Sequence, residues 1–202
     1  MNMRTSSLTA LALATALTAS QVAAGDRWLI GLDGLSSHIE DNNDEDSISV
    51  DEKASGGALQ IGYRFSPNFM LRIYGGTADH PTSDPKVDIR FGGGLFEGVY
   101  LFRDGQSLRP YMFGGVGGFG LESQQASLLY KAEGAGVSFG GGLHYLVSRR
   151  VSLHGSLRLE AVNWNTVSVT YTAPDGGELA VETPVEESGF ASKVTFGVAF
   201  WL

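Results

Sequence analysis

The chain has 202 residues, of which 28 are glycine, six are proline and none is cysteine. The lack of cysteine excludes a disulfide framework, a thiolate metal cluster and a cysteine nucleophile. A formal net charge of −8 argues against a nucleic-acid partner, and a hydrophobic content of 43% is too high for a disordered chain.

Residues 1–24 have the composition of a secretory signal peptide. Arg4 precedes a short, mostly apolar stretch, and small residues end the segment at Ala24. The alternative is an N-terminal membrane anchor, but the stretch is shorter than the ~20 apolar residues that a transmembrane helix needs. We therefore expect cleavage between Ala24 and Gly25, which leaves one mature domain over 25–202.

Apolar and polar residues alternate along most of the mature chain. Val194, Phe196 and Val198, for example, alternate with Thr195 and Gly197. Side chains of a strand point to opposite faces in turn, so this period of two predicts strands, and no comparable run has helical spacing. In chain order, the expected strands span 26–38, 54–65, 69–79, 87–102, 108–121, 133–147, 151–164 and 189–202.

The expected connections alternate between tight and long. Links after the second, fourth and sixth strands are tight, whereas the other links are longer and more polar, and 165–188 is the longest. Apolar residues flank the turn inside 165–188, which predicts that the last two strands extend as a hairpin. An even number of strands with this arrangement is typical of a bacterial outer-membrane barrel, in which a closed sheet satisfies every backbone group in lipid. The expected fold is all-β, an eight-stranded antiparallel up-and-down transmembrane β-barrel.

A soluble β-sandwich or a lipocalin-like barrel would also show alternation. Two features favour the membrane barrel: the face opposite the apolar one carries charges, and aromatic residues gather near strand ends, as in the aromatic girdles of such barrels. The expected girdle consists of Trp28, Tyr63, Phe65, Tyr100, Phe102, Tyr145 and Phe200.

The segment 87–102 does not fit simple alternation. Phe91 shares its parity with the charged Glu97, whereas Phe96 has the opposite parity. A bulge at 92–94 would switch the faces, place Phe91 on the apolar side and leave Glu97 inside. For the fifth strand, alternation does not show which residues point into the barrel and which point outward.

Three segments resemble a known family. Residues 109–117 (RPYMFGGVG) are similar to the "PY-x-x-x-G-x-G" strand of OmpA-type outer-membrane barrel domains, and 139–162 resemble the strand, turn and strand that follow. Residues 194–202 (VTFGVAFWL) resemble the C-terminal strand that the barrel-assembly machinery recognises, with Val198, Phe200 and Leu202 as the expected signal.

This resemblance has two departures from the family pattern. The last residue is Leu202, where such strands usually end in phenylalanine, and we expect no peptidoglycan-binding domain after the barrel. The resemblance therefore implies no cell-wall tethering. In size the chain is closer to the stand-alone barrels of the OmpX and Ail type, some of which act in adhesion and serum resistance.

The expected long loops carry most of the negative charge. Residues 39–53 have a net charge of −6 and residues 165–188 a net charge of −5. Oxygen ligands suit Ca²⁺ and Mg²⁺, so these loops are candidates for loosely bound cations above lipopolysaccharide phosphates. The candidate ligands are Asp41, Asp44, Glu45 and Asp46. They lack the spacing of an EF-hand loop, and a solvated charged loop is the plainer interpretation. No other cofactor is expected.

Charged residues are also expected inside the barrel. The parity of the strands assigns Arg64, Arg72, Glu97, His144, His154, Arg158 and Glu160 to the lumen. A charge in a narrow lumen must be paired or hydrated, so we expect arginine–glutamate pairs that fill the interior. A narrow gated pore is the alternative.

His154 and Ser156 share one strand face with Glu160. This His-x-Ser arrangement with a glutamate is similar to that of outer-membrane lipid A deacylases, where the serine would be the nucleophile. Parity points these side chains into the lumen, away from lipid, so a hydrolase is only a second alternative. The sequence predicts a monomeric, non-enzymatic protein of the outer membrane that supports the envelope and contacts lipid, lipopolysaccharide and other molecules through acidic loops.

Overall fold

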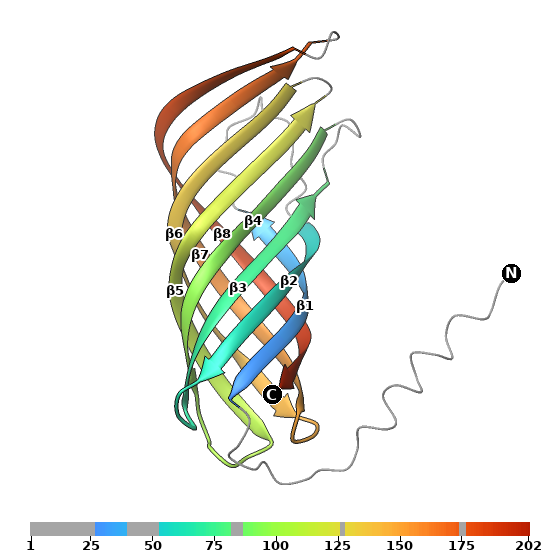
Figure 1. The fold of residues 1–202 in the computed structure, drawn as a ribbon, viewed down its shortest axis with the longest axis vertical. Helices are drawn as coiled ribbons and strands as arrows, with labels where there is room; N and C mark the ends of the chain where they lie inside the picture. The colour runs from blue at the N-terminus through green and yellow to red at the C-terminus, as the bar shows by residue number, and fades with distance from the viewer. Residues whose placement is uncertain (1–26, 40–52, 82–86, 126–127, 174–176) are drawn as a thin grey trace, which may run out of the picture.

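The computed structural model describes residues 27–39, 53–81, 87–125, 128–173 and 177–202. They form eight strands that pair in chain order, each antiparallel to its neighbours, and β8 pairs with β1 to close a barrel (Figure 1). The strands are β1 (Trp28–Ile39), β2 (Lys53–Arg64), β3 (Phe69–His80), β4 (Val87–Leu101), β5 (Leu108–Gln125), β6 (Leu128–Leu146), β7 (Val151–Thr172) and β8 (Glu178–Trp201). The predicted eight-stranded barrel is confirmed. Within the described ranges, no helix has the length and hydropathy needed to cross a membrane.

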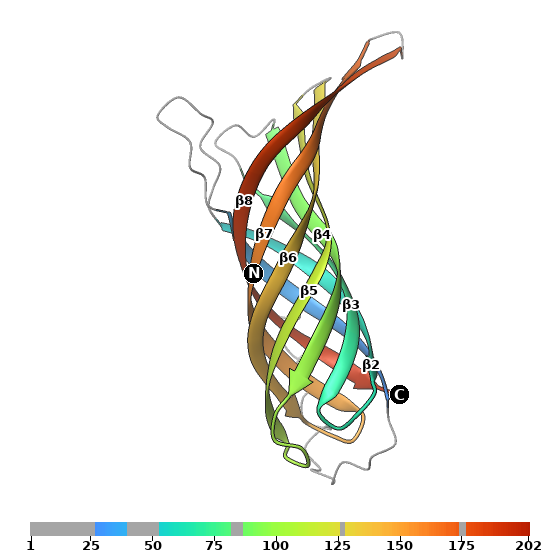
Figure 2. The same cartoon turned by 90° about the vertical axis from the view of Figure 1, so that its left-hand side faces the viewer.

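The two ends of the barrel differ. Short turns join β2 to β3, β4 to β5 and β6 to β7 at one end, called here the turn end, and the opposite end is called the open end. β1 has 12 residues and β8 has 24. At about 3.3 Å per residue, β8 is roughly 79 Å long and β1 roughly 40 Å. β7 and β8 therefore rise past the other strands at the open end (Figures 1 and 2).

Two expected loops are largely strand. β5 ends at Gln125 and β6 begins at Leu128, so the long link expected between the strands 108–121 and 133–147 is wrong. β7 continues to Thr172 and β8 begins at Glu178, which confirms the predicted hairpin extension but replaces most of the loop 165–188. The pairing register shifts near Trp164, and such a bulge breaks the alternation from which strands are read in sequence.

The bulge predicted at 92–94 is also wrong. The register of β4 with β3 and with β5 is continuous through these glycines. Phe91 therefore faces the lumen together with Glu97, whereas Phe96 faces outward and is exposed. Alternation was misleading here because the lumen is not wholly polar: Phe91 packs inside on Phe119, and Nζ of Lys193 lies 4.4 Å from its ring centroid.

The faces of β5 are now assigned. Tyr111, Phe113 and Phe119 are buried in the lumen, and Met112 and Val116 are exposed on the outside. The outer surface is apolar elsewhere too, as expected of a wall in contact with lipid. Six of the seven girdle aromatics are 41–56% exposed: Trp28, Phe65, Tyr100, Phe102, Tyr145 and Phe200.

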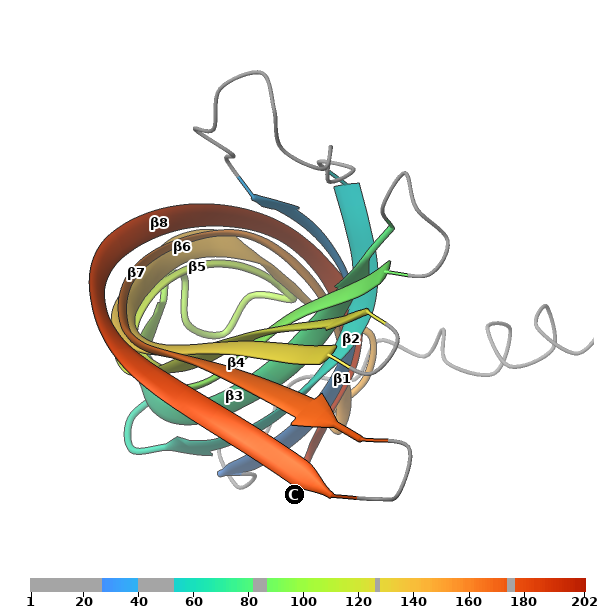
Figure 3. The same ribbon diagram turned by 90° about the horizontal axis from the view of Figure 1, so that it is seen from above.

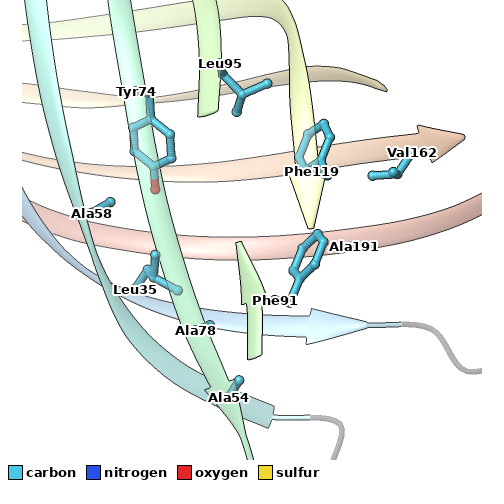
Figure 4. Close-up of a cluster of buried hydrophobic side chains, with 10 residues drawn as sticks. All are labelled: Leu35, Ala54, Ala58, Tyr74, Ala78, Phe91, Leu95, Phe119, Val162 and Ala191. Atoms are coloured by element: carbon cyan, nitrogen blue, oxygen red, sulfur yellow. The ribbon is translucent and has the colours of Figure 1, made fainter. Parts of the chain in front are cut away.

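Figure 3 shows the ring of strands from above. Buried side chains fill the interior of this ring. Towards the open end lies an upper apolar layer, shown in Figure 4, which consists of Leu35, Ala54, Ala58, Tyr74, Ala78, Phe91, Leu95, Phe119, Val162 and Ala191. Towards the turn end lies a lower apolar layer, which consists of Leu29, Met70, Val99, Leu101, Tyr111, Phe113, Ala199 and Trp201. Six buried charged residues lie between these two layers: Asp33, Arg72, Glu97, Arg158, Glu160 and Lys193.

Candidate functional site

Glu97 of β4 is the centre of a buried ion network. It is fully buried, and its Oε2 lies 2.8 Å from Nε and 2.6 Å from Nη2 of Arg72, the residue directly opposite on β3. Its Oε1 accepts a hydrogen bond from Arg158 of β7. Arg158 also donates to Oγ of Ser138 at 2.7 Å. One carboxylate therefore holds two guanidinium groups that come from opposite sides of the barrel.

The network continues towards β1 and β2. Nη1 of Arg72 donates to Oε1 of Gln60 at 2.8 Å, and the amide nitrogen of Gln60 donates to Asp33 at 3.0 Å. His154 bonds to Asp33 through Nε2, which also lies 2.7 Å from the Gln60 amide nitrogen. Side chains from distant strands are thus joined across the full width of the lumen.

The network also continues towards β8. Nζ of Lys193 lies 2.7 Å from Oε2 of Glu160, and Oε1 of Glu160 lies 4.0 Å from Nε of Arg158. The charged members of the network among the described residues are Asp33, Glu97 and Glu160 against Arg72, Arg158 and Lys193. These three acidic and three basic side chains balance in formal charge.

Aromatic rings of the two apolar layers border the ion network. The guanidinium carbon of Arg158 lies 4.0 Å from the ring centroid of Tyr74 and 4.6 Å from that of Phe113. Tyr74 belongs to the upper apolar layer and Phe113 to the lower one. A cation over a desolvated ring is attracted by its quadrupole, so the rings help to hold the charge in place. The side chains of the ion network and of the two apolar layers therefore fill the lumen at this level and plug the barrel.

The structure places five of the six predicted members of the lumen charge network inside the barrel at 4% exposure or less: Arg72, Glu97, His144, Arg158 and Glu160. His144 is not among the ion pairs, because its ring stacks on His154 with centroids 5.1 Å apart. Arg64 is half-buried at the turn end, where its guanidinium lies 5.1 Å from the ring of Trp201.

Sequence reasoning missed Asp33, Gln60 and Lys193. Each occupies the inward parity of a predicted strand, so the rule that selected Arg72 and Glu97 would have found them as well. Only the register, however, shows which of these groups meet.

His154 and Ser156 do not act on each other. Nε2 of His154 is bonded to Asp33, whereas Oγ of Ser156 lies 2.7 Å from Oγ1 of Thr195. Glu160, the third member of the candidate hydrolase, is ion-paired with Lys193. A serine nucleophile needs a base within hydrogen-bond reach, and these contacts supply no such base.

A second candidate site is the part of β6, β7 and β8 beyond the barrel, called here the tall wall. Its inner face is apolar: Tyr130, Val169 and Val181 form one cross-strand row, and Leu128, Tyr171 and Leu179 form the next. Leu179 and Val181 are 71% and 65% exposed. The outer face is more polar: one of its rows consists of Lys131, Ser168 and Glu182, and the next consists of Leu129, Thr170 and Ala180. This is the reverse of the lower barrel, where the outer face is apolar.

The tall wall has an open edge. The pairing of β8 with β1 ends at Ala191, opposite Ile39, whereas its pairing with β7 continues to Glu178. Within the described part of the chain, residues 178–190 therefore pair on one side only. Four glutamates and Pro184 lie along this edge, and charge and proline are the devices that keep edge strands from pairing at random.

The remaining predicted sites are the metal ligands, the cleavage site and the assembly signal. The candidate metal ligands Asp41, Asp44, Glu45 and Asp46, and the cleavage site at Ala24 and Gly25, lie outside the described residues. Across the described ranges, no group of three or more His, Cys, Asp or Glu side chains is placed to hold a metal ion. Phe200 and Leu202 of the expected assembly signal are exposed on the outer face, and Val198 shares that face by alternation.

Comparison with known proteins agrees with this architecture. The family described as "Outer membrane protein beta-barrel domain" matches residues 9–181. Among solved structures, the chain is similar to Neisserial surface protein A, with 15% identity, a TM-score of 0.59 and coverage of 87% of this chain and 97% of that one. It is also similar to a major outer membrane protein from Thermus thermophilus, with 10% identity, a TM-score of 0.60 and coverage of 87% and 99%.

Ail, the attachment invasion locus protein of Yersinia pestis, has 10% identity and a TM-score of 0.56, with coverage of 88% of this chain and 99% of that one. At these identities the likeness concerns the fold alone. No match is found among curated proteins.

Proposed function

Because this chain belongs to the outer-membrane β-barrel protein family, we propose that it is a non-enzymatic surface protein of the bacterial outer membrane. In this family the short turns face the periplasm and the long strands face the exterior, so the open end is extracellular. The plugged barrel anchors the chain and supports the envelope, and the tall wall contacts other molecules.

The observation that carries this proposal is the exposed apolar face of the tall wall. Leu179 and Val181 are 71% and 65% exposed although they lie beyond the lipid-facing part of the barrel. Together with Tyr130 and Tyr171, which are 39% and 40% exposed, they form a contiguous apolar surface in water. Surfaces of this kind mark interaction sites, because burying them on a partner is favourable.

The edge of β8 indicates the chemistry of the partner. Among the described residues, 178–190 pair with β7 only, so an extended segment can add to the sheet on the other side. Glu178, Glu182 and Glu186 line this stretch and would attract basic side chains. The partner that fits is an extended segment with alternating basic and apolar residues.

Two other functions receive less support. A pore would need a hydrated path, whereas two apolar layers enclose the ion network and Arg158 is held between two rings. A hydrolase would need His154 to reach Ser156, and each is bonded elsewhere. The acidic segment 39–53, with loosely bound Ca²⁺ or Mg²⁺, stays a proposal for further surface contact.

A labelled peptide of alternating lysine and valine tests the proposal by fluorescence anisotropy with the protein in nanodiscs. Leu179→Lys with Val181→Lys places two charges on the inner face, and the matched control Thr170→Lys with Ala180→Lys places two charges on the outer face. Loss of two apolar contacts should weaken binding of the peptide at least about tenfold in the first variant only. Equal weakening in both variants would mean that the apolar face is not the contact.

A further inference from the structure

The outer face of β3 to β6 carries a row of alternating charges. Asp79, Arg90, Glu122 and Lys131 occupy consecutive cross-strand positions, and all four are exposed. Nε of Arg90 donates to Oδ1 of Asp79 at 2.7 Å, whereas Nζ of Lys131 lies 4.0 Å from Oε2 of Glu122.

The height of this row is set by the girdle at the turn end. From Tyr100 to Arg90 the chain of β4 covers about 33 Å, or about 25 Å of height at a strand tilt of about 40°. That height matches the hydrocarbon band of an outer-membrane barrel, so Arg90 lies at its extracellular boundary. From Tyr145 to Lys131 the chain of β6 covers about 46 Å, or about 35 Å of height, so Lys131 lies above this boundary, on the headgroup side.

Two hollows adjoin the row. One of about 410 Å³ is lined by Thr77, Arg90 and Lys131 and by the backbone at Gly92 and Gly120. A second of about 510 Å³ shares Arg90 with it and includes Asp79 and Ser55. Both volumes lie in the range of about 300–1,000 Å³ that small-molecule sites occupy. The first hollow, called here the outer groove, begins at the charged row and reaches the next cross-strand row towards the turn end, at Thr77, Gly92, Gly120 and Glu133, whereas the second lies at the charged row and towards the open end.

The lining of the outer groove selects a particular chemistry. A separation of 4.0 Å is too long for a hydrogen bond, so the ammonium of Lys131 can donate to an incoming anion. Glu122 and Glu133 line the first hollow and accept hydrogen bonds, which favours a ligand with hydroxyl donors besides its phosphate. Below the charges, Gly92 and Gly120 offer a surface without side chains to an acyl chain.

We propose that the outer groove binds one molecule of the phosphorylated, acylated sugar lipid of the outer leaflet. Its phosphate lies against Lys131 and Arg90, its sugar hydroxyls donate to Glu122 and Glu133, and an acyl chain passes over Gly120. This site is on the opposite face from the surface assigned to partner contact, so either assignment can fail without the other.

Native mass spectrometry of the detergent-solubilised protein tests the site with three probes: diphosphoryl lipid A, monophosphoryl lipid A and phosphatidylglycerol. The wild type should retain one diphosphoryl lipid A about tenfold better than phosphatidylglycerol, since hydroxyl and phosphate contacts both contribute. Lys131→Gln should remove most of this preference. Arg149→Gln removes an exposed arginine at the turn end and should leave the preference unchanged.

The variant Gly120→Leu tests the groove without changing charge. A Cβ at this position meets its nearest atom at 4.0 Å, so the barrel accepts the side chain while the groove is filled. Retention of lipid A should fall about tenfold, with folding checked by the migration of the unheated protein on gels. Equal retention of lipid A and phosphatidylglycerol, equal loss in Lys131→Gln and Arg149→Gln, or full retention in Gly120→Leu would each overturn the proposal.

Discussion

Replacing Glu97 by glutamine should be among the most damaging single changes in the barrel. The variant keeps the size of the side chain and removes one negative charge from a site that is fully buried. Arg72 and Arg158 would then share a lumen with an excess positive charge. At an effective dielectric constant of about 20, a charge pair about 2.7 Å apart is worth roughly 6 kcal/mol in gross Coulomb energy. Desolvation offsets much of this, so the expected loss in free energy of unfolding is about 3–5 kcal/mol.

Equilibrium urea unfolding in phospholipid vesicles, followed by tryptophan fluorescence, measures this loss. Glu122→Gln is the matched control, because Glu122 is exposed and its pair with Lys131 spans 4.0 Å; it should cost less than about 1 kcal/mol. Adding Arg72→Met to Glu97→Gln restores the charge balance, so the double variant should be at least about 2 kcal/mol more stable than the two single losses predict. A loss in Glu97→Gln equal to that of the control would refute the buried-pair argument.

Three further predictions concern packing, catalysis and conduction. Gly117→Ala should cost at least about 2 kcal/mol of stability, because an added Cβ would collide with the carbonyl oxygen of Gly94 on the neighbouring strand. Gly94→Ala, whose Cβ meets nothing within 4 Å, should change the urea midpoint little. Mass spectrometry of lipid A should show the same acyl chains with and without the protein; loss of a chain that depends on His154 and Ser156 would restore the hydrolase. Planar bilayers should show no steady conductance, and a reproducible unitary current would mean that the plug is incomplete.

Much of the fold follows from the sequence because its signals are local. Alternation over segments such as 194–202 reports which residues share a face, and tight links after every second strand report where the chain turns back. These two signals predicted eight strands, the closed ring and the girdle of aromatic residues. The same alternation predicts that Arg72, Glu97 and Arg158 point into the lumen, because they lie on the strand face opposite the apolar face that contacts lipid.

Alternation, however, shows which residues share one face of a strand, but it does not show whether that face contacts lipid, water or the lumen. Phe91 is apolar and was therefore predicted to face lipid. In the structure, Phe91 stacks on Phe119 inside the barrel, with ring centroids 6.1 Å apart. The tall wall was not predicted for the same reason. Beyond the lipid, the apolar Leu179 faces inward and the charged Glu182 faces outward, whereas lower in the barrel apolar residues face outward and charged residues face inward.

The amino-acid sequence by itself therefore determined the number of strands, their order and the inward position of the charges, since each depends on a period of two along one segment. The tertiary structure alone decided that Arg72 meets Glu97, that Lys193 meets Glu160 and that the outer groove opens below Lys131. Each of these contacts depends on the register between strands and on the closure of the ring. Both are properties of the whole sheet, and no single strand encodes them.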